Sequence, residues 1–184
     1  MDELGENRIY DTHEWGSKDI KYYAQKIIKQ LDCSYIDCLL IHWPLKLDND
    51  LISDEFIIPE IWIQMEKLVD IGITKKIGLS NFGVLDIQQI LNMCRIKPYI
   101  NQIEVSLVCN NNNVVNFCKK NEIKVMAHSS FRKDTLNNEW WEKMPALYNL
   151  EEKYKATKHQ IILNWITQQN IIPCFSTTNL LFSN

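Results

Sequence analysis

Short apolar runs that alternate with amphipathic segments constrain the fold of this chain most strongly. Residues 35–41 are too apolar for a strand with one face in water, and so favour a parallel sheet covered by helices. Similar short runs recur along the chain, each followed by polar residues. We therefore predict six strands, at residues 8–12, 35–41, 76–80, 99–105, 123–127 and 171–173.

The segments between these runs carry apolar residues at the helical period. The first stripe is Ile20, Tyr23, Ala24, Ile27, Ile28 and Leu31, the second is Ile61, Trp62, Met65, Leu68 and Val69, and the third is Leu85, Ile90, Leu91 and Cys94. Helix-start signals accompany the later segments: Pro59 suits a first helical position, asparagines at 111–113 are N-cap candidates, and Thr157 with Gln160 has capping-box spacing. Strands that alternate with helices imply parallel strands joined by right-handed crossovers, so the predicted class is α/β.

Composition limits the classes of function. The chain has 184 residues, of which 46% are hydrophobic, enough for one core and one domain. Its net charge is −3 and its basic residues are scattered, so we expect no nucleic-acid partner. No apolar run approaches the roughly 20 residues that span a bilayer, and the first residues are acidic, so we expect no membrane anchor and a cytoplasmic location.

Six cysteines could form three disulfides, but they fall singly along the predicted helices and strands, with no CxxC spacing. Free thiols in a reducing cytosol are therefore the favoured interpretation. The six are Cys33, Cys38, Cys94, Cys109, Cys118 and Cys174.

Four stretches, at residues 35–44, 76–82, 101–104 and 160–165, together resemble the aldo-keto reductases. They read Tyr-Ile-Asp through Ile-His-Trp-Pro, Lys-Ile-Gly-Leu-Ser-Asn-Phe, Asn-Gln-Ile-Glu and Gln-Ile-Ile-Leu-Asn-Trp, in the family's order and spacing. The resemblance implies an incomplete (β/α)8 TIM barrel with about six parallel strands, the third to the eighth of the family barrel, and surrounding helices. A single partial barrel domain would span residues 1–184, without the first two βα units.

The resemblance also implies a catalytic site. The family places an Asp, a Tyr, a Lys and a His around a substrate carbonyl, and the Asp and Tyr belong to a segment upstream of these residues. The lysine position falls at His13, within Thr-His-Glu-Trp, and the histidine position is His42. The alternative for His42 is a partly buried strand-end histidine that packs against Trp43. Trp43 and Trp15 would line the substrate pocket.

Hydride delivery to a carbonyl leaves negative charge on oxygen, and a positioned proton donor contributes about 10²–10⁴-fold. The family's donor is the absent Tyr. We therefore expect an NAD(P)H-dependent oxidoreductase of aldehydes or ketones with weak or lost activity. The alternative is a catalytically inactive pseudoenzyme that serves as a nucleotide-sensing or protein-interaction module. A third hypothesis is that an upstream segment supplies the Asp and Tyr and restores ordinary reductase function.

Ser80, Asn81 and Gln102 match the family positions that hydrogen-bond the nicotinamide carboxamide. A carboxamide needs both an acceptor and a donor, and these side chains supply both. The alternative, polar strand ends that face water, explains each residue singly but not all three. His128, followed by Ser129, stands where the family has a ring that stacks on nicotinamide, although an exposed loop histidine is an equal alternative.

The adenosine end of the cofactor site is less complete. Cys174 replaces the family lysine that pairs with the 2′-phosphate of NADP, and Ser176 is the remaining candidate for part of that phosphate site. The cofactor is therefore NADP(H) or NAD(H), with weak binding expected. His13, His42 and His128 could together bind Zn²⁺, but nothing in their spacing enforces convergence, so we predict no metal.

An incomplete barrel has an additional consequence. A barrel removes the edges of its sheet by closing on itself, so a chain without the first two strands exposes two edges. Unpaired edges favour association. Self-association through these edges, coverage by the N-terminal residues, and a marginally stable remnant are all compatible with the sequence. If the chain is active, its substrate is expected to be a small carbonyl compound.

Overall fold

A curved sheet of six parallel strands is the central element of the computed structural model, which describes residues 8–9, 20–44, 47–48, 51–52, 58–131 and 144–175. The strands are β1 (Arg8–Ile9), β2 (Leu39–Ile41), β5 (Ile77–Ser80), β6 (Ile100–Glu104), β7 (Lys124–His128) and β8 (Ile172–Pro173). They lie side by side in chain order, and each pairs in parallel with the next. The six predicted parallel strands are confirmed, and their order is that of a barrel wall.

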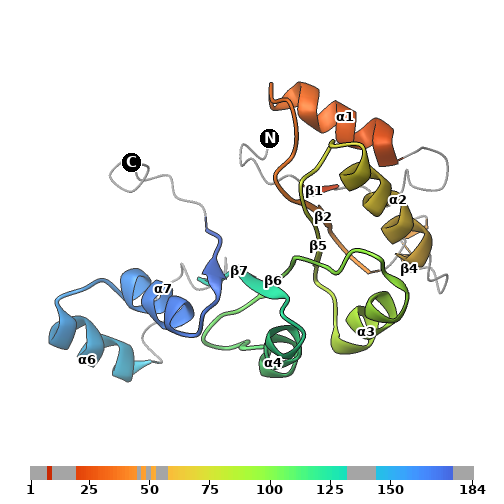
Figure 1. Cartoon of the computed structure of the whole chain (residues 1–184). Coiled ribbons are helices and arrows are strands. Elements are labelled where there is room, and N and C mark those ends of the chain that lie inside the picture. Colours follow the sequence, from red (N-terminus) through yellow and green to blue (C-terminus); the bar gives the residue numbers. More distant parts are fainter. Residues whose placement is uncertain are drawn as a thin grey trace.

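Helices connect successive strands of this sheet. Figure 1 shows them in an arc along one side of it, from α1 near β1 to α7 beside β8. They are α1 (Ile20–Gln30), α2 (Ile58–Asp70), α3 (Val84–Met93), α4 (Asn112–Lys120), α6 (Pro145–Tyr154) and α7 (Lys158–Gln168). Within the described part of the chain, no helix has both the length and the apolar character that a membrane span requires.

Two elements were not predicted. A short antiparallel hairpin, β3 (Leu47–Asp48) with β4 (Leu51–Ile52), lies between β2 and α2, and strands of two residues leave no periodic pattern in a sequence. Helix α6 precedes α7 between β7 and β8, so this crossover has two described helices. Leu147 is its one buried residue, which explains why its amphipathic signal was weak.

The helix stripes are confirmed with two corrections. Leu85 was predicted to face inward but is 77% exposed, because Ile87 and Ile90 form the buried side of α3. Leu31 is also exposed, since α1 ends one residue earlier, at Gln30.

The capping predictions had mixed outcomes. Thr157 and Gln160 form the predicted capping box at the start of α7, with Gln160 N donating to Thr157 Oγ1 over 3.3 Å. Asn111 is the N-cap residue of α4, but its side chain makes no capping bond. It donates instead to the carbonyl of Glu104 over 2.7 Å, which ties the start of α4 to the end of β6.

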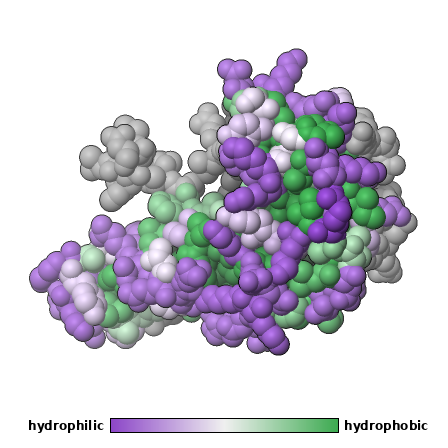
Figure 2. All heavy atoms as spheres, viewed as in Figure 1, coloured by the Kyte–Doolittle hydropathy of each residue, from purple (hydrophilic) through white to green (hydrophobic). Residues whose placement is uncertain are grey.

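The core lies between the sheet and the helices. Every residue of β2 and β5 is buried, as the apolar run of the predicted strand indicated. Trp62 of α2 is fully buried and donates through Nε1 to the carbonyl of Ile96 over 3.1 Å. Figure 2 shows hydrophobic residues gathered in the region of α1 and α2 and hydrophilic residues along the lower rim.

The cysteines are not joined to one another: no two of the six, all of which lie within the described residues, form a disulfide. This confirms the prediction of thiols over a disulfide framework. Burial raises the pKa of both Cys38 and Cys118 to about 11. These two thiols therefore remain protonated at neutral pH.

The sheet is not closed within the described residues. Strands β1 and β8 lie at its two ends, and each pairs with one described neighbour, β2 and β7 respectively. A six-stranded open sheet with barrel topology fits the predicted incomplete barrel. Association through its edges remains a prediction.

Gly78 of β5 has no room for a side chain. A Cβ atom there would lie 2.7 Å from Ile100 Cγ2, Ile100 O and Leu40 Cδ2, and the carbonyl cannot move without breaking the sheet. We expect Gly78→Ala to lower the free energy of unfolding by about 1–3 kcal/mol in urea denaturation. Gly83→Ala is the comparison variant: its added Cβ meets only Asp86 Oδ2, at 3.2 Å, and because Gly83 is the N-cap residue of α3 a smaller loss, below about 1 kcal/mol, is expected. Equal losses in the two variants would contradict this account.

Candidate functional site

Asn81 joins the carboxyl ends of three neighbouring strands. It follows β5 directly and has a φ of 62°, the left-handed conformation that asparagine tolerates better than most residues. Its backbone N–H donates to the carbonyl of Gln102 on β6 over 2.9 Å. Its side-chain Nδ2 donates to the carbonyl of His42, just after β2, over 3.0 Å, and to Ser80 Oγ over 3.3 Å. These bonds bring the backbones of Gln102 and His42 and the side chain of Ser80 next to Asn81, and a cavity shared by the four side chains stays a prediction.

His128, the last residue of β7, extends this network. Its Nε2 lies 2.9 Å from Asn81 Oδ1, and its Nδ1 lies 3.0 Å from Ser129 Oγ. Because an amide oxygen can only accept, Nε2 carries the hydrogen, and Nδ1 of the neutral ring accepts from the serine hydroxyl. Ser129 itself has a φ of 53°. Both ends of the Asn81 amide are therefore engaged by protein groups.

Gln102 faces the side of the sheet away from the helices. The side chain of its neighbour Asn101 points toward the helices: its Nδ2 donates to Phe82 O over 3.0 Å and lies near Cys118 of α4. Because side chains alternate along a strand, Gln102 points to the opposite face. Gln102 is 3% exposed and lies opposite Ser80 and Met126 in the sheet register. The Nε2 of Gln102 reaches the sulfur of Met126 at 2.9 Å.

The Oε1 of Gln102 is buried and has no hydrogen-bond partner among the described residues. A buried acceptor left without a donor costs about 1–3 kcal/mol. Ser80, its neighbour across the strand pair, is fully buried as well. The site therefore holds a protected acceptor that a ligand N–H group could satisfy.

His42 and Trp43 lie together at the end of β2. Their ring centroids are 5.6 Å apart and the planes are tilted by 47°, which is the contact that the packing alternative predicts. His42 is half-buried, whereas Trp43 is 49% exposed and accessible to a small molecule. His13, Trp15 and Ser176 lie outside the described residues.

Two further residues belong to this region and were not predicted. Met126 contacts Gln102, and it lies two residues before His128 on the same face of β7, a period-2 relation that the sequence contains. Ser130 is 4% exposed, and its Oγ has no partner among the described residues. No sequence signal distinguishes Ser130 from an ordinary loop serine.

A metal centre is not visible in the described part of the chain: no three His, Cys, Asp or Glu side chains there lie close enough to hold an ion. The site instead consists of amide, hydroxyl and imidazole groups around a buried acceptor. Such side chains can both donate and accept hydrogen bonds.

The chain is similar to known reductases over nearly its whole length. The family model described as the aldo/keto reductase family matches residues 10–181. Aldose reductase B of Dictyostelium discoideum is 30% identical over 95% of this chain and 61% of its own length. The NADPH-dependent alpha-keto amide reductase of Saccharomyces cerevisiae is 35% identical over 79% of this chain and 47% of its own. The chain therefore spans about half to three fifths of the length of these relatives.

Solved structures show the same likeness. An aldo-keto reductase of Bombyx mori (AKR2E4) in complex with NADP matches with a TM-score of 0.78 and 26% identity, over 96% of this chain and 62% of that one. The aldose reductase of Schistosoma japonicum matches with a TM-score of 0.78 and 27% identity over the same shares.

Substitutions at Asn81 separate its backbone and side-chain roles. We expect Asn81→Gly to lower the free energy of unfolding by about 1–3 kcal/mol, because its bonds to His42 and His128 are lost while the left-handed backbone is retained. Asn81→Ala should lose about 1 kcal/mol more, since alanine also strains that backbone. Urea denaturation measures both differences.

The control is Asn170→Gly. Asn170 has a φ of 58° and is exposed, and its side chain makes no hydrogen bond among the described residues, so this change should cost almost nothing. A loss at Asn170 as large as that at Asn81 would contradict the linking role of the Asn81 side chain.

Proposed function

Because the chain belongs to the aldo/keto reductase family, we propose that it binds NAD(P)H and reduces aldehydes or ketones with low efficiency. The cofactor's nicotinamide end would lie at the carboxyl ends of β5, β6 and β7, against Ser80, Asn81 and Gln102. Solved relatives include a complex with NADP, which supports a dinucleotide as the ligand. The bound cofactor would supply hydride to the carbonyl carbon.

One observation carries the proposal: the buried Oε1 of Gln102 that has no partner among the described residues. The NH₂ of a carboxamide is a donor that would satisfy it, and the buried hydroxyl of Ser80 can donate to the carboxamide oxygen. Asn81 can contribute only by sharing or releasing its 2.9 Å bond to His128. That competition supports weak binding.

His42 is proposed to orient the substrate oxygen by hydrogen bonding, with Trp43 forming part of the pocket wall. The family's Asp and Tyr have no counterpart in this sequence, and the lysine position holds His13. A missing proton donor removes about 10²–10⁴-fold of rate, so turnover by this chain is proposed to be slow. A segment that supplied those residues would restore it.

The residues at the adenosine end of the site do not favour NADP strongly over NAD. Cys174 replaces the lysine that would pair with the 2′-phosphate, and its backbone N–H is held by the carbonyl of Ala127 over 2.8 Å. The position is therefore anchored to the sheet but carries no cation. Ser176 remains the proposed candidate for a phosphate contact.

A second candidate function is a nucleotide-binding pseudoenzyme. The presence of Ser80, Asn81 and Gln102 together with His13 at the family's lysine position favours it, because the cofactor-binding side chains are kept while a residue of the catalytic set is replaced. The two candidates share the cofactor site and differ in turnover.

Cofactor binding is tested by titrating the intrinsic fluorescence of NADPH against the purified chain. We expect saturable binding that Gln102→Leu weakens about tenfold, the equivalent of one lost hydrogen bond of about 1.4 kcal/mol. Gln88→Leu is the matched control, because Gln88 is an exposed residue of α3 that bonds only to Asn92 in the described structure. Absence of binding at millimolar NADPH would remove both candidate functions.

Turnover decides between the two candidates once binding is seen. With a nitrobenzaldehyde as substrate, we expect slow NADPH oxidation that His42→Ala abolishes while cofactor affinity stays within about twofold. Binding without turnover would support the pseudoenzyme. A rate unchanged in His42→Ala would show that His42 has a packing role against Trp43 only.

A further inference from the structure

The opposite end of the sheet holds a second cluster of chemically active side chains. Lys76 immediately precedes β5, Tyr99 immediately precedes β6, and Lys124 is the first residue of β7. The parallel ladder fixes them beside one another: Tyr99 N donates to Ile77 O over 2.9 Å, and Lys124 N donates to Tyr99 O over 3.0 Å. Asn81 and His128 lie at the other ends of these same strands.

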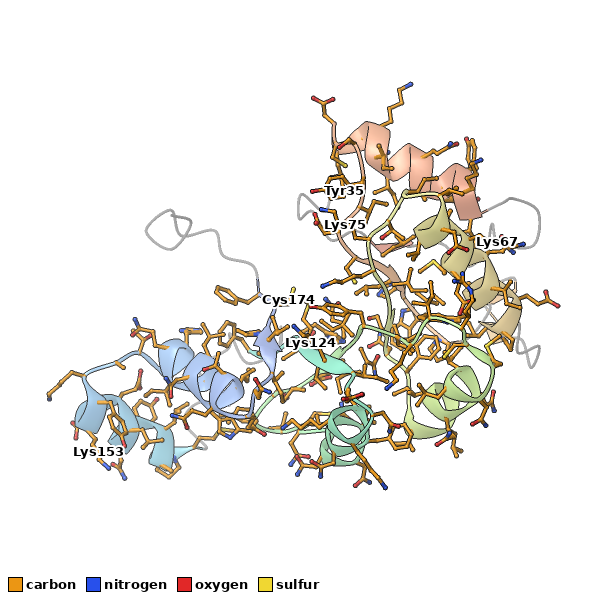
Figure 3. The ribbon with its side chains drawn as sticks, in the orientation of Figure 1. Tyr35, Lys67, Lys75, Lys124, Lys153 and Cys174 are labelled. Carbon is orange, nitrogen blue, oxygen red and sulfur yellow. The ribbon has the colours of Figure 1, made fainter. Side chains whose placement is uncertain are left out.

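Both lysines converge on the ring of Tyr99. The Nζ of Lys76 lies 3.7 Å from the ring centroid and that of Lys124 lies 5.0 Å from it. Lys76 and Lys124 are exposed, and Tyr99 is half-buried. Lys124, and then Lys76, favour the ionised phenol by hydrogen bonding and so lower the pKa of Tyr99. Figure 3 labels Lys124 beside the central strands.

These two cations lack the counter-charges that neighbouring lysines have. Lys75 contacts Asp37 at 3.4 Å, and Lys97 contacts Glu122 at 3.3 Å. Within the described residues, neither Lys76 nor Lys124 has a carboxylate within 4.0 Å. Two like charges held against one ring therefore form a local excess of positive charge that an anion would neutralise.

We propose that Lys76, Lys124 and the hydroxyl of Tyr99 bind a phosphate group at the amino-terminal end of the sheet. Three donors from three adjacent strands match the several acceptor oxygens of a phosphate better than the two of a carboxylate. The ligand is either inorganic phosphate or the terminal phosphate of a phosphorylated small molecule. The site is separate from the proposed nicotinamide site and independent of it.

The pKa of Tyr99 should show whether phosphate is bound. A bound dianion offsets the two ammonium charges, so the pKa of Tyr99 should rise back toward its ordinary value when phosphate binds. Because the cations are exposed, affinity should fall as ionic strength rises.

Calorimetric titration with inorganic phosphate and with glycerol phosphate, at constant ionic strength, tests the site. We expect one saturable site in the full chain, weakened about tenfold by Lys76→Gln or Lys124→Gln. Tighter binding of the ester than of inorganic phosphate would identify the phosphorylated molecule as the ligand, and the reverse would identify free phosphate. The matched control is Lys153→Gln, because Lys153 also lies over a single tyrosine ring, Tyr154, at 4.9 Å, but on α6 (Figure 3).

Absence of saturable binding, or an equal loss in Lys153→Gln, would overturn the proposal. Phenol ionisation followed by ultraviolet absorbance in the wild-type chain provides a test that needs no folded lysine variant. The component removed by Tyr99→Phe should shift to higher pH when phosphate is added. If phosphate does not shift the Tyr99 component of the titration, the two lysines only pack against the tyrosine ring.

Discussion

The parallel direction of the strands is the constraint on which the rest of the structure depends. Parallel pairing places every carboxyl end at one edge of the sheet, so that residues far apart in sequence meet there. Asn81 connects three of these strands. Its backbone bonds to Gln102 of β6, and its side chain bonds to His42, just after β2, and to His128, the last residue of β7. Its left-handed conformation turns the chain away from β5 and leaves the amide among the strand ends.

The polar groups at this edge are of two kinds, those with a hydrogen-bond partner and those without one among the described residues. Asn81 and His128 satisfy each other, whereas the Oε1 of Gln102 is buried without a partner among the described residues. Folding alone gains nothing from such an unpaired acceptor, so a ligand donor is its natural complement. Cofactor affinity should be modest for the same reason. The Oε1 of Gln102 can accept a bond from the ligand at once, but the amide of Asn81 must first break its bond to His128.

The two ends of the sheet differ in their chemistry. The carboxyl end carries amides, hydroxyls and imidazoles with no ammonium group among the residues of its network, and it suits a neutral planar group such as a carboxamide. The amino end carries Lys76 and Lys124 around Tyr99, and it suits an anion. Both sets arise from the same ladder, because the register pairs Ser80 with Gln102 near one end, and Ile100 with Lys124 at the other.

The sequence by itself determined the α/β class, the six parallel strands, most helix stripes and the capping box at Thr157, because each depends on local periodicity or short spacing. It also indicated that Ser80, Asn81 and Gln102 would lie near His42, since parallel strands bring their carboxyl-terminal halves to one edge of the sheet. Only the tertiary structure decided that Ile87 rather than Leu85 faces the core, that His128 bonds to Asn81, and that Gln102 keeps an unpaired oxygen. Those features depend on side-chain direction and on register between strands, which no pattern within one segment contains.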